Sequence, residues 1–296
     1  MKKFVKALAA ITLAAGLVGC SSGSSAATSN GNSKSSGDDK TITVGATAVP
    51  HAEILNDAVA PVLKKEGYTL KVTVFNDYVQ PNTAVEDGEL DANYYQTLGY
   101  LNDQNKQRKL HLVAVAGVHI EPMGIYSKKI KDIKDLKDGA EISLPNDSDN
   151  EDRALQFLVA QGLLNDPKKD GNLTDADFNG NATTNPHNYK ISPVEAAQVA
   201  LTLDDVDAGV VNGNYALEAK LPETNPALVT EKFDDDTTIA RTNFIVVKED
   251  NKDSAKTKAL VKAVNSDEVK KYIDDTYKGS VIASFVDPDS IDTSKY

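Results

Sequence analysis

A short polar run, residues 146–153 with the sequence NDSDNEDR, offers groups that could bind a small anion. It leads into an apolar pattern that predicts a helix from about Glu151 to Gly162, and Ser148 and Glu151 stand in capping-box spacing. The N–H groups at the start of such a helix and the guanidinium of Arg153 together suit a carboxylate. From spacing alone, the stronger explanation is that the run only caps the helix and that Arg153 pairs with a surface acid.

Aromatic and amide side chains stand together at three expected strand ends: residues 75–78 (FNDY), 93–95 (NYY) and 212–215 (NGNY). Ligands of open α/β sheets bind beyond the carboxyl ends of strands. An amide side chain can serve both an ammonium and a carboxylate. Asn-Gly and Asn-Asp are also ordinary turn residues, so each run taken singly is better explained as a turn.

Motifs of catalysis and metal binding are missing from the sequence. The four histidines, His51, His111, His119 and His187, are far apart, and there is no HExxH, GxSxG, Walker A or GxGxxG pattern. We therefore expect no catalytic residue, no metal and no cofactor. Two alternatives stay open, a hydrolase that uses carboxylates in a cleft and a metal-binding protein, each tethered to a membrane by the segment described next. The second would use His51 and His119 and needs a further ligand that the sequence does not identify.

The first twenty residues read as a leader. Lysines 2, 3 and 6 precede an apolar stretch over 7–18 that is too short to span a bilayer. Residues 17–20 (LVGC) end at Cys20, the single cysteine of the chain, and resemble the lipobox of bacterial lipoproteins. That resemblance implies a signal peptide over 1–19 and an acylated Cys20, for example with palmitate, that anchors the protein to the membrane. An ordinary secretion signal with a chance cysteine is the alternative.

Composition sets further bounds. Residues 20–40 are rich in Ser, Gly and Asn without large apolar residues, which predicts a disordered tether. The chain has 296 residues and a formal charge of −12, so its acidic surface argues against nucleic acid as a partner. The roughly 255 residues after the tether suffice for one large domain or two medium ones.

Short apolar strands alternate with amphipathic helices from Thr41 onward, which predicts an α/β fold with largely parallel sheets. Pro61 should kink the helix expected over His51–Glu66 or mark its boundary. Residues 165–188 should form a surface excursion. Further strands are expected over Ile42–Ala46, Thr69–Phe75, Ala92–Tyr95, Leu112–Ile120, Ala140–Leu144, Ala208–Val211 and Phe244–Val247, and further helices near Leu98–Gln107, Asp253–Val264 and Asp267–Tyr277.

Five motifs in one order carry a more specific signal. They are FNDYVQPN (75–82), DANYY (91–95), IEPMGIYSKK (120–129), PNDSDNEDRAL (145–155) and LDDVDAGVVNGNYA (203–216). From about Thr41 to Tyr277, and including the lipobox, the chain closely resembles the MetQ-type methionine-binding lipoproteins, also called the NlpA family.

The resemblance implies a substrate-binding protein of an ABC importer, with a periplasmic-binding-protein-like fold. Two α/β lobes would be joined by two hinges near Pro122–Tyr126 and Ala240–Ile245, with the ligand cleft between them. Lobe one would comprise 41–121 and 244–296, and lobe two 124–241. The protein would be a monomer on the extracytoplasmic face of the bacterial cell membrane. Its partners would be an amino acid, the importer's membrane subunits and, through Cys20, the membrane.

The resemblance also assigns site residues. It implies that Arg153 binds the ligand carboxylate, that Asn212 is a central contact, and that Tyr78 and Tyr95 line the side-chain pocket, where aromatic rings suit a thioether. The remaining ligand-binding residues of the expected set are Asn93, His119 and Asn150.

The chain departs from many relatives at Thr97, at Ala200-Leu201 and at Arg241. We expect Thr97 and Arg241 to influence which ligand side chain is preferred. The sequence thus indicates a lipoprotein that captures an amino acid, methionine first, for an ABC importer. Another amino acid or a short peptide remains the alternative ligand.

Overall fold

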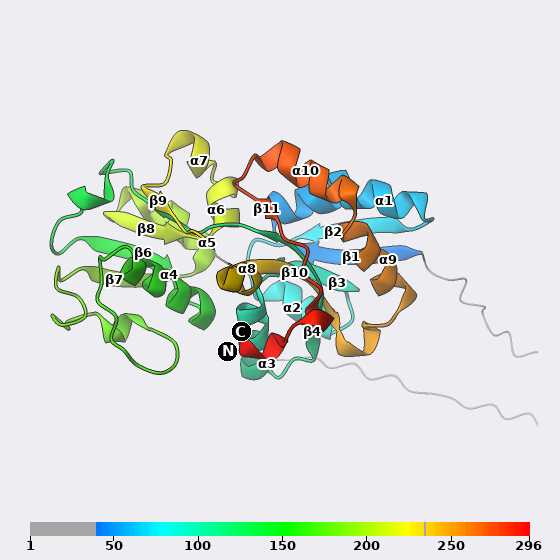
Figure 1. Cartoon of the computed structure of the whole chain (residues 1–296), viewed down its shortest axis with the longest axis horizontal. Helices are drawn as coiled ribbons and strands as arrows, with labels where there is room; N and C mark the ends of the chain where they lie inside the picture. Colours follow the sequence, from blue (N-terminus) through cyan, green and yellow to red (C-terminus); the bar gives the residue numbers. More distant parts are fainter. Residues whose placement is uncertain (1–39, 234) are drawn as a thin grey trace, which may run out of the picture. The chain divides into compact units, whose positions relative to one another are not determined.

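The computed structural model describes residues 40–233 and 235–296, and two mixed β-sheets organise this part of the chain (Figure 1). The expected signal peptide, Cys20 and nearly all of the expected tether lie outside the described residues. Within the described part, no helix has both the length and the apolar character needed to cross a membrane.

The first sheet has six strands in the order β11-β4-β10-β3-β1-β2. Its apolar residues alternate between two faces, as strand geometry requires. One face packs against α2 and α3, and the other against η1, η2, α1, α9 and α10 (Figure 1). The strands are β1 (Thr41–Ala46), β2 (Thr69–Val74), β3 (Ala92–Gln96), β4 (Leu112–Ile120), β10 (Thr242–Lys248) and β11 (Ile282–Ala283). The helices are η1 (Ala48–Ala52), η2 (Ile54–Val59), α1 (Ala60–Lys65), α2 (Gln80–Glu86), α3 (Leu98–Arg108), α9 (Ala255–Val264) and α10 (Asp267–Tyr277).

The second sheet has five strands in the order β7-β6-β8-β5-β9. Helix α4 closes one face over an apolar core, and α5, α6 and α7 pack into a separate cluster with residues of β5 and β8. The strands are β5 (Gly124–Tyr126), β6 (Glu141–Pro145), β7 (Lys190–Val194), β8 (Ala208–Val211) and β9 (Val229–Thr230). The helices are α4 (Ser148–Ala160), α5 (Ala196–Val199), α6 (Gly213–Glu218) and α7 (Leu221–Thr224).

The chain passes between the sheets twice, from β4 to β5 and from β9 through α8 (Asp235–Arg241) to β10. The expected α/β class is confirmed, but the expectation of largely parallel sheets is wrong. Strand β10 returns antiparallel to both β3 and β4, and β5 is antiparallel to both β8 and β9. β5 and β10 are the first strands after the two crossings, so their direction is set by where the chain enters the sheet and not by a crossover helix within that sheet.

Of two local expectations about this helical segment, one is corrected and the other is confirmed. The single helix expected over His51–Glu66 is a succession of π-helical turns, η1 and η2, that continue into α1. Pro61 lies in the first turn of α1 and therefore does mark a boundary, because a proline ring is tolerated there and not in a helix interior.

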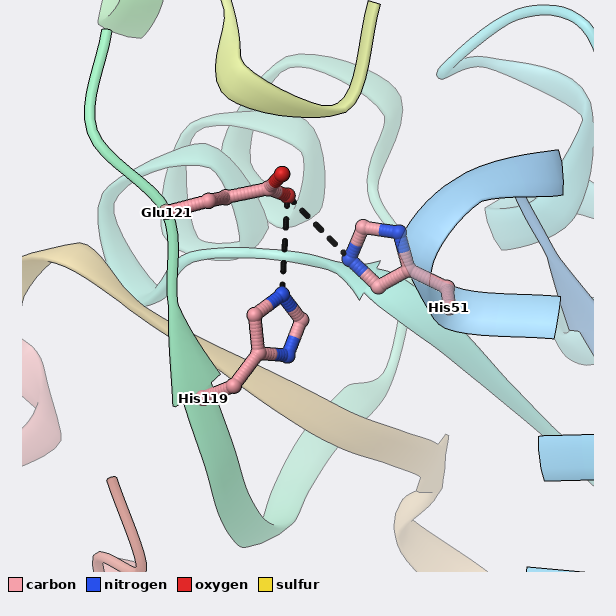
Figure 2. Close-up of side chains that lie close together, drawn as sticks. All are labelled: His51, His119 and Glu121. Atoms are coloured by element: carbon pink, nitrogen blue, oxygen red, sulfur yellow. Dashed lines mark ion pairs between the residues drawn. The ribbon is translucent and has the colours of Figure 1, made fainter. Parts of the chain in front are cut away.

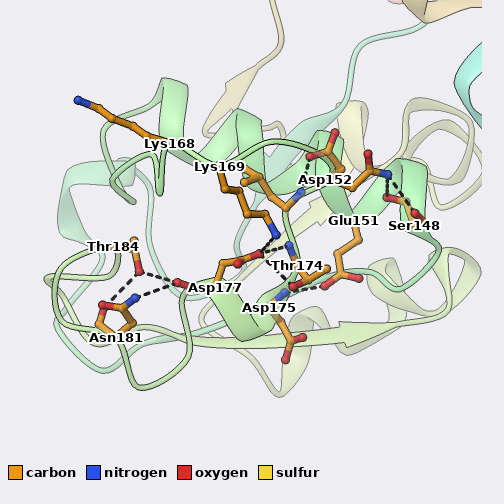
Figure 3. Close-up of polar contacts among 12 residues, drawn as sticks. Ser148, Glu151, Asp152, Lys168, Lys169, Thr174, Asp175, Asp177, Asn181 and Thr184 are labelled. Atoms are coloured by element: carbon orange, nitrogen blue, oxygen red, sulfur yellow. Dashed lines mark hydrogen bonds and ion pairs between the residues drawn. The ribbon is translucent and has the colours of Figure 1, made fainter.

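The excursion over residues 165–188 is fastened to the first turns of α4 (Figure 3). Asp152 accepts a bond of 2.8 Å from the N–H of Leu173, and Glu151 accepts one of 2.7 Å from the N–H of Asp175. Two acidic residues of the NDSDNEDR run therefore hold this segment in place and are not available to a ligand.

Candidate functional site

A small cavity of about 30 Å³ lies among residues that the two sheets position. One part of its lining comes from the loop after β2, the end of β3 and start of α3, the residue after β4 and the start of β10. The other part comes from α4 and the start of α6. The lining residues are Tyr78, Tyr95, Gln96, Thr97, Tyr100, Glu121, Asn150, Arg153, Asn212, Gly213, Asn214 and Asn243. Five of the expected site residues are thus brought together: Tyr78, Tyr95, Asn150, Arg153 and Asn212.

The start of α4 positions two of these side chains. Asp147 is the N-cap and accepts a 3.0 Å bond from the N–H of Asn150, so the expected capping box of Ser148 and Glu151 is wrong. Asp147 also accepts a bond of 2.8 Å from Nδ2 of Asn150, which turns Oδ1 of Asn150 toward Asn212. Nδ2 of Asn212 donates to that oxygen at 2.7 Å. The cap therefore orients the amide pair in the cavity wall.

Arg153 points into the same wall from the second turn of α4. Its Nη2 lies 2.5 Å from Oε2 of Glu231, its Nε lies 2.9 Å from Oε1, and Nη2 also donates to the carbonyl of Glu121 at 3.3 Å. Burial alone would lower the pKa of Arg153, but the charge of Glu231 holds that pKa above its ordinary value. The partner is thus a buried acid and not a surface acid, and the guanidinium also lines the cavity.

Aromatic rings form another part of the lining. Tyr78 lies 5.6 Å from Tyr95 and 5.7 Å from Tyr100 between ring centroids, and it stacks on Tyr215 at 5.0 Å. The hydroxyls of Tyr95 and Tyr100 both donate to the carbonyl of Tyr78, at 2.7 and 3.0 Å. Burial raises the pKa of Tyr78 and Tyr95 well above the ordinary value, so both phenols stay neutral.

Three polar atoms of the lining are buried and have no hydrogen-bond partner among the described residues. They are two acceptors, Oε2 of Glu121 and Oδ1 of Asn212, and one donor, Nδ2 of Asn214. Unpaired buried polar atoms are destabilising by about 1–3 kcal/mol each, so such atoms commonly mark a place that a ligand completes.

Two expected site residues lie outside the lining. Asn93 donates to Asn82 at 2.8 Å and accepts from Gln96 at 2.8 Å, so it supports the lining residue Gln96 from behind. His119 bonds through Nδ1 to the hydroxyl of Tyr94 and approaches Glu121. Thr97 and Arg241 are the two positions expected to influence which ligand is preferred. Thr97 lines this cavity, whereas Arg241 lines a neighbouring cavity, and Arg153 lines both.

The expected set of ligand-binding residues left out Gln96, Tyr100, Glu121, Gly213, Asn214 and Asn243 of this lining. Glu121 lies within the IEPMGIYSKK motif and Asn214 within the last quoted motif, so both carried a signal that was not used. Tyr100 and Asn243 lie in none of the quoted motifs, and the sequence marked them only by their proximity to Tyr95 and to Arg241.

Beside the cavity, His51, His119 and Glu121 converge from η1, from β4 and from the residue after β4 (Figure 2). Oε1 of Glu121 lies 3.5 Å from Nε2 of His51 and 3.6 Å from Nε2 of His119. Burial lowers the pKa of His51 to about 4 and that of His119 to about 3, and burial raises the pKa of Glu121 to about 7. Both imidazoles are therefore neutral at physiological pH.

The two sheets together position a cavity that polar and aromatic side chains line, which is typical of a protein that binds a small solute. Comparison with known proteins agrees with this class. Residues 42–285 match the NlpA lipoprotein family. The methionine-binding lipoprotein MetQ of Bacillus subtilis is 39% identical over 250 residues, which cover 82% of this chain and 88% of that protein.

Solved structures give the same picture. A nutrient-binding protein from Burkholderia cenocepacia bound to methionine aligns with a TM-score of 0.76 at 43% identity, over 82% of this chain and all of that one. The substrate-binding protein of a methionine transporter from Streptococcus pneumoniae aligns with a TM-score of 0.76 at 35% identity, over 83% and 96% of the two chains. The chain belongs to the NlpA lipoprotein family, as its motifs predicted, and is a substrate-binding lipoprotein and not an enzyme.

Proposed function

We propose that the protein captures an amino acid, methionine first, in the cavity around Arg153 and Asn212 and delivers it to an ABC importer. The observation that carries this proposal is the set of unpaired lining atoms. Oε2 of Glu121 and Oδ1 of Asn212 can accept from an ammonium group. Nδ2 of Asn214 and Nη1 of Arg153, which makes none of the three bonds described above, can donate to a carboxylate.

The aromatic side of the cavity supports methionine as the ligand. Tyr78, Tyr95 and Tyr100 present ring faces and edges close together, and a polarisable thioether gains about 0.3–1.5 kcal/mol from such contacts. Relatives whose names refer to methionine agree with this choice. Another amino acid or a short peptide is the alternative, because Thr97 places a hydroxyl in the lining.

Capture would proceed by closure of two lobes, 41–121 with 244–296 and 124–241. The crossings between the sheets would bend at residues 121–123 and at the junction of α8 with β10, since these stand next to paired strands. Closure would be driven by contacts that exist only when both lobes touch the ligand.

A thermal-shift panel of the common amino acids tests the ligand assignment. A ligand that binds only the folded state raises the melting temperature, and we expect methionine to give the largest shift. If no amino acid at millimolar concentration shifts the melting temperature, the amino-acid assignment is wrong.

We also propose that Cys20 carries the lipid anchor and that the domain faces the outside of the cytoplasmic membrane. The support is the leader sequence and membership in a lipoprotein family. Cys20→Ser should move the protein from the membrane fraction to the soluble fraction. Equal retention of parent and variant in the membrane would contradict the anchor.

A further inference from the structure

The cluster of His51, His119 and Glu121 has the composition and spacing of a metal site. One ligating atom from each residue lies within 4.8 Å of the other two. The side chains of both histidines are fully buried, and that of Glu121 is 6% exposed. Figure 2 shows both imidazole rings directed at one carboxylate oxygen.

Hydrogen bonding alone explains this cluster poorly. The N···O distances of 3.5 and 3.6 Å exceed those of ordinary N–H···O bonds. Nε2 of His119 has no hydrogen-bond partner among the described residues. A buried ring nitrogen that stays unpaired is destabilising unless something else occupies the space that it faces.

A four-coordinate metal ion would account for these distances. Zinc binds nitrogen and carboxylate oxygen at about 2.0–2.2 Å, so two ligands of a tetrahedron stand roughly 3.3–3.5 Å apart. The two measured N···O distances are close to this value. Oδ1 of Asn243 accepts a 3.1 Å hydrogen bond from Nε2 of His51; once the proton of this ring lies on Nδ1 instead, the same oxygen can supply a fourth ligand.

The outer ring nitrogens are already held in the manner of metal-binding histidines. Nδ1 of His51 lies 2.7 Å from Oγ1 of Thr47, and Nδ1 of His119 bonds to the hydroxyl of Tyr94. Metal binding requires Nδ1 of each ring to carry the proton. For His51 this means exchanging the Nε2–H bond to Asn243 for an Nδ1–H bond to Oγ1 of Thr47, after which Nε2 presents a lone pair toward Glu121. Such outer partners fix the tautomer and the orientation of a ligating imidazole.

We propose that His51, His119 and Glu121 bind one divalent transition-metal ion of the zinc type, with Asn243 as the additional oxygen ligand. Two imidazoles disfavour calcium and magnesium, which prefer all-oxygen sites. Glu121 follows β4 and Asn243 belongs to the start of β10, so the ion would tie η1 to both segments that connect the sheets. The metal site would therefore border the amino-acid cavity, because Glu121 and Asn243 also line it.

The test is metal titration of the purified mature protein after treatment with a chelator, without any amino acid present. Calorimetry with Zn²⁺ should show one equivalent bound. Co²⁺ should give the visible absorption of a tetrahedral ion. His119→Gln should weaken binding by at least roughly 10–100-fold, the loss known for outer-shell partners alone, and Glu121→Gln should do the same.

The matched control is His187→Gln, because His187 is 44% exposed and pairs with Asp138 outside this cluster. It should leave the single tight site unchanged. Absence of a stoichiometric ion in the parent protein would overturn the proposal, even if the buried variants fail to fold. A site that His187→Gln removes, or that Glu121→Gln and His119→Gln both leave intact, would also overturn it. Since the titration contains no amino acid, its outcome is independent of the proposed transport function.

Discussion

Arg153 and Glu231 form a forked ion pair that is almost completely buried. Nη2 and Nε of Arg153 lie 2.5 and 2.9 Å from the two carboxylate oxygens, and the side chains are 6% and 11% exposed. Glu231 also accepts a 2.7 Å bond from the N–H of Met123, at the crossing from β4 to β5. Burial would raise the pKa of Glu231, but Arg153 holds that pKa below its ordinary value. Arg153, which we propose binds the ligand carboxylate, therefore also holds the crossing from β4 to β5 in place through Glu231.

This pairing predicts that Arg153→Ala has two separable effects. Binding of amino acids should weaken by at least tenfold, because a charge-assisted contact is lost. The free energy of unfolding should fall by about 3–5 kcal/mol, because Glu231 is left buried and unpaired. Calorimetric titration and urea denaturation measure the two effects.

The double variant Arg153→Met/Glu231→Gln separates the two roles. It removes both charges, so most of the lost stability should return while binding stays weak. A double variant that binds methionine as tightly as the parent would show that Arg153 is only structural.

Asn212→Ala should weaken the binding of every amino acid that the protein accepts. The substitution removes the acceptor Oδ1 from the lining and the 2.7 Å bond to Asn150, so ligand and protein groups lose partners at about 1–3 kcal/mol each. Asn265→Ala is the matched control, since Asn265 is exposed at the end of α9. Equal affinities of the two variants, measured by calorimetry, would remove Asn212 from the site.

Tyr78→Phe should weaken affinity roughly 3–10-fold without changing the order of preferred amino acids. The hydroxyl donates to Oδ1 of Asn214 at 2.5 Å and so links the segment after β2 to α6, while the ring contacts survive in Phe. Tyr78→Ala should reduce the preference for methionine as well. Tyr68→Phe, remote from the cavity, serves as the control. An unchanged affinity for Tyr78→Phe would mean that this bond does not help to close the site.

The parts of this site that could be predicted from the sequence share one property. Tyr78, Tyr95, Asn150, Arg153 and Asn212 all lie within the contiguous motifs that carry the family resemblance, and the resemblance, not local spacing, assigned them to the site. Glu231, by contrast, lies 78 residues from Arg153 in a stretch without a motif, so only the folded chain could pair them. His51 likewise lies far along the chain from His119 and Glu121, and no metal-ligand spacing in the sequence joins them.

The β-strands show the same limit of prediction from local sequence patterns. Short apolar runs located most strands, such as β4 and β10, and alternation of apolar and polar residues located β2. The antiparallel direction of β10 depends on where the chain re-enters the first sheet, which no local pattern records.

Asp147 provides a test by pH. Burial raises its pKa from 3.8 to about 6, although bonds from Asn150 act in the opposite direction. The folded state therefore binds the proton of the Asp147 carboxyl more tightly than the unfolded state does. The stability that this protonation contributes is lost as pH rises from about 4 to 6. Asparagine caps a helix equally well. Relative to the parent, Asp147→Asn should thus gain stability between pH 4 and pH 7, by at most about 3 kcal/mol.

Urea denaturation at the two pH values measures this gain. Asp250→Asn, an exposed substitution, should show no such difference. If the parent and Asp147→Asn change in parallel between pH 4 and pH 7, Asp147 does not carry the buried proton.

Native mass spectrometry of the mature protein tests the central claim most directly. We expect the protein to carry one methionine, either as isolated or after addition of methionine at micromolar concentration. The Arg153→Met/Glu231→Gln variant should carry none under the same conditions. A parent protein that stays free of any amino acid at millimolar methionine, or a double variant that retains the same mass increase, would contradict the account.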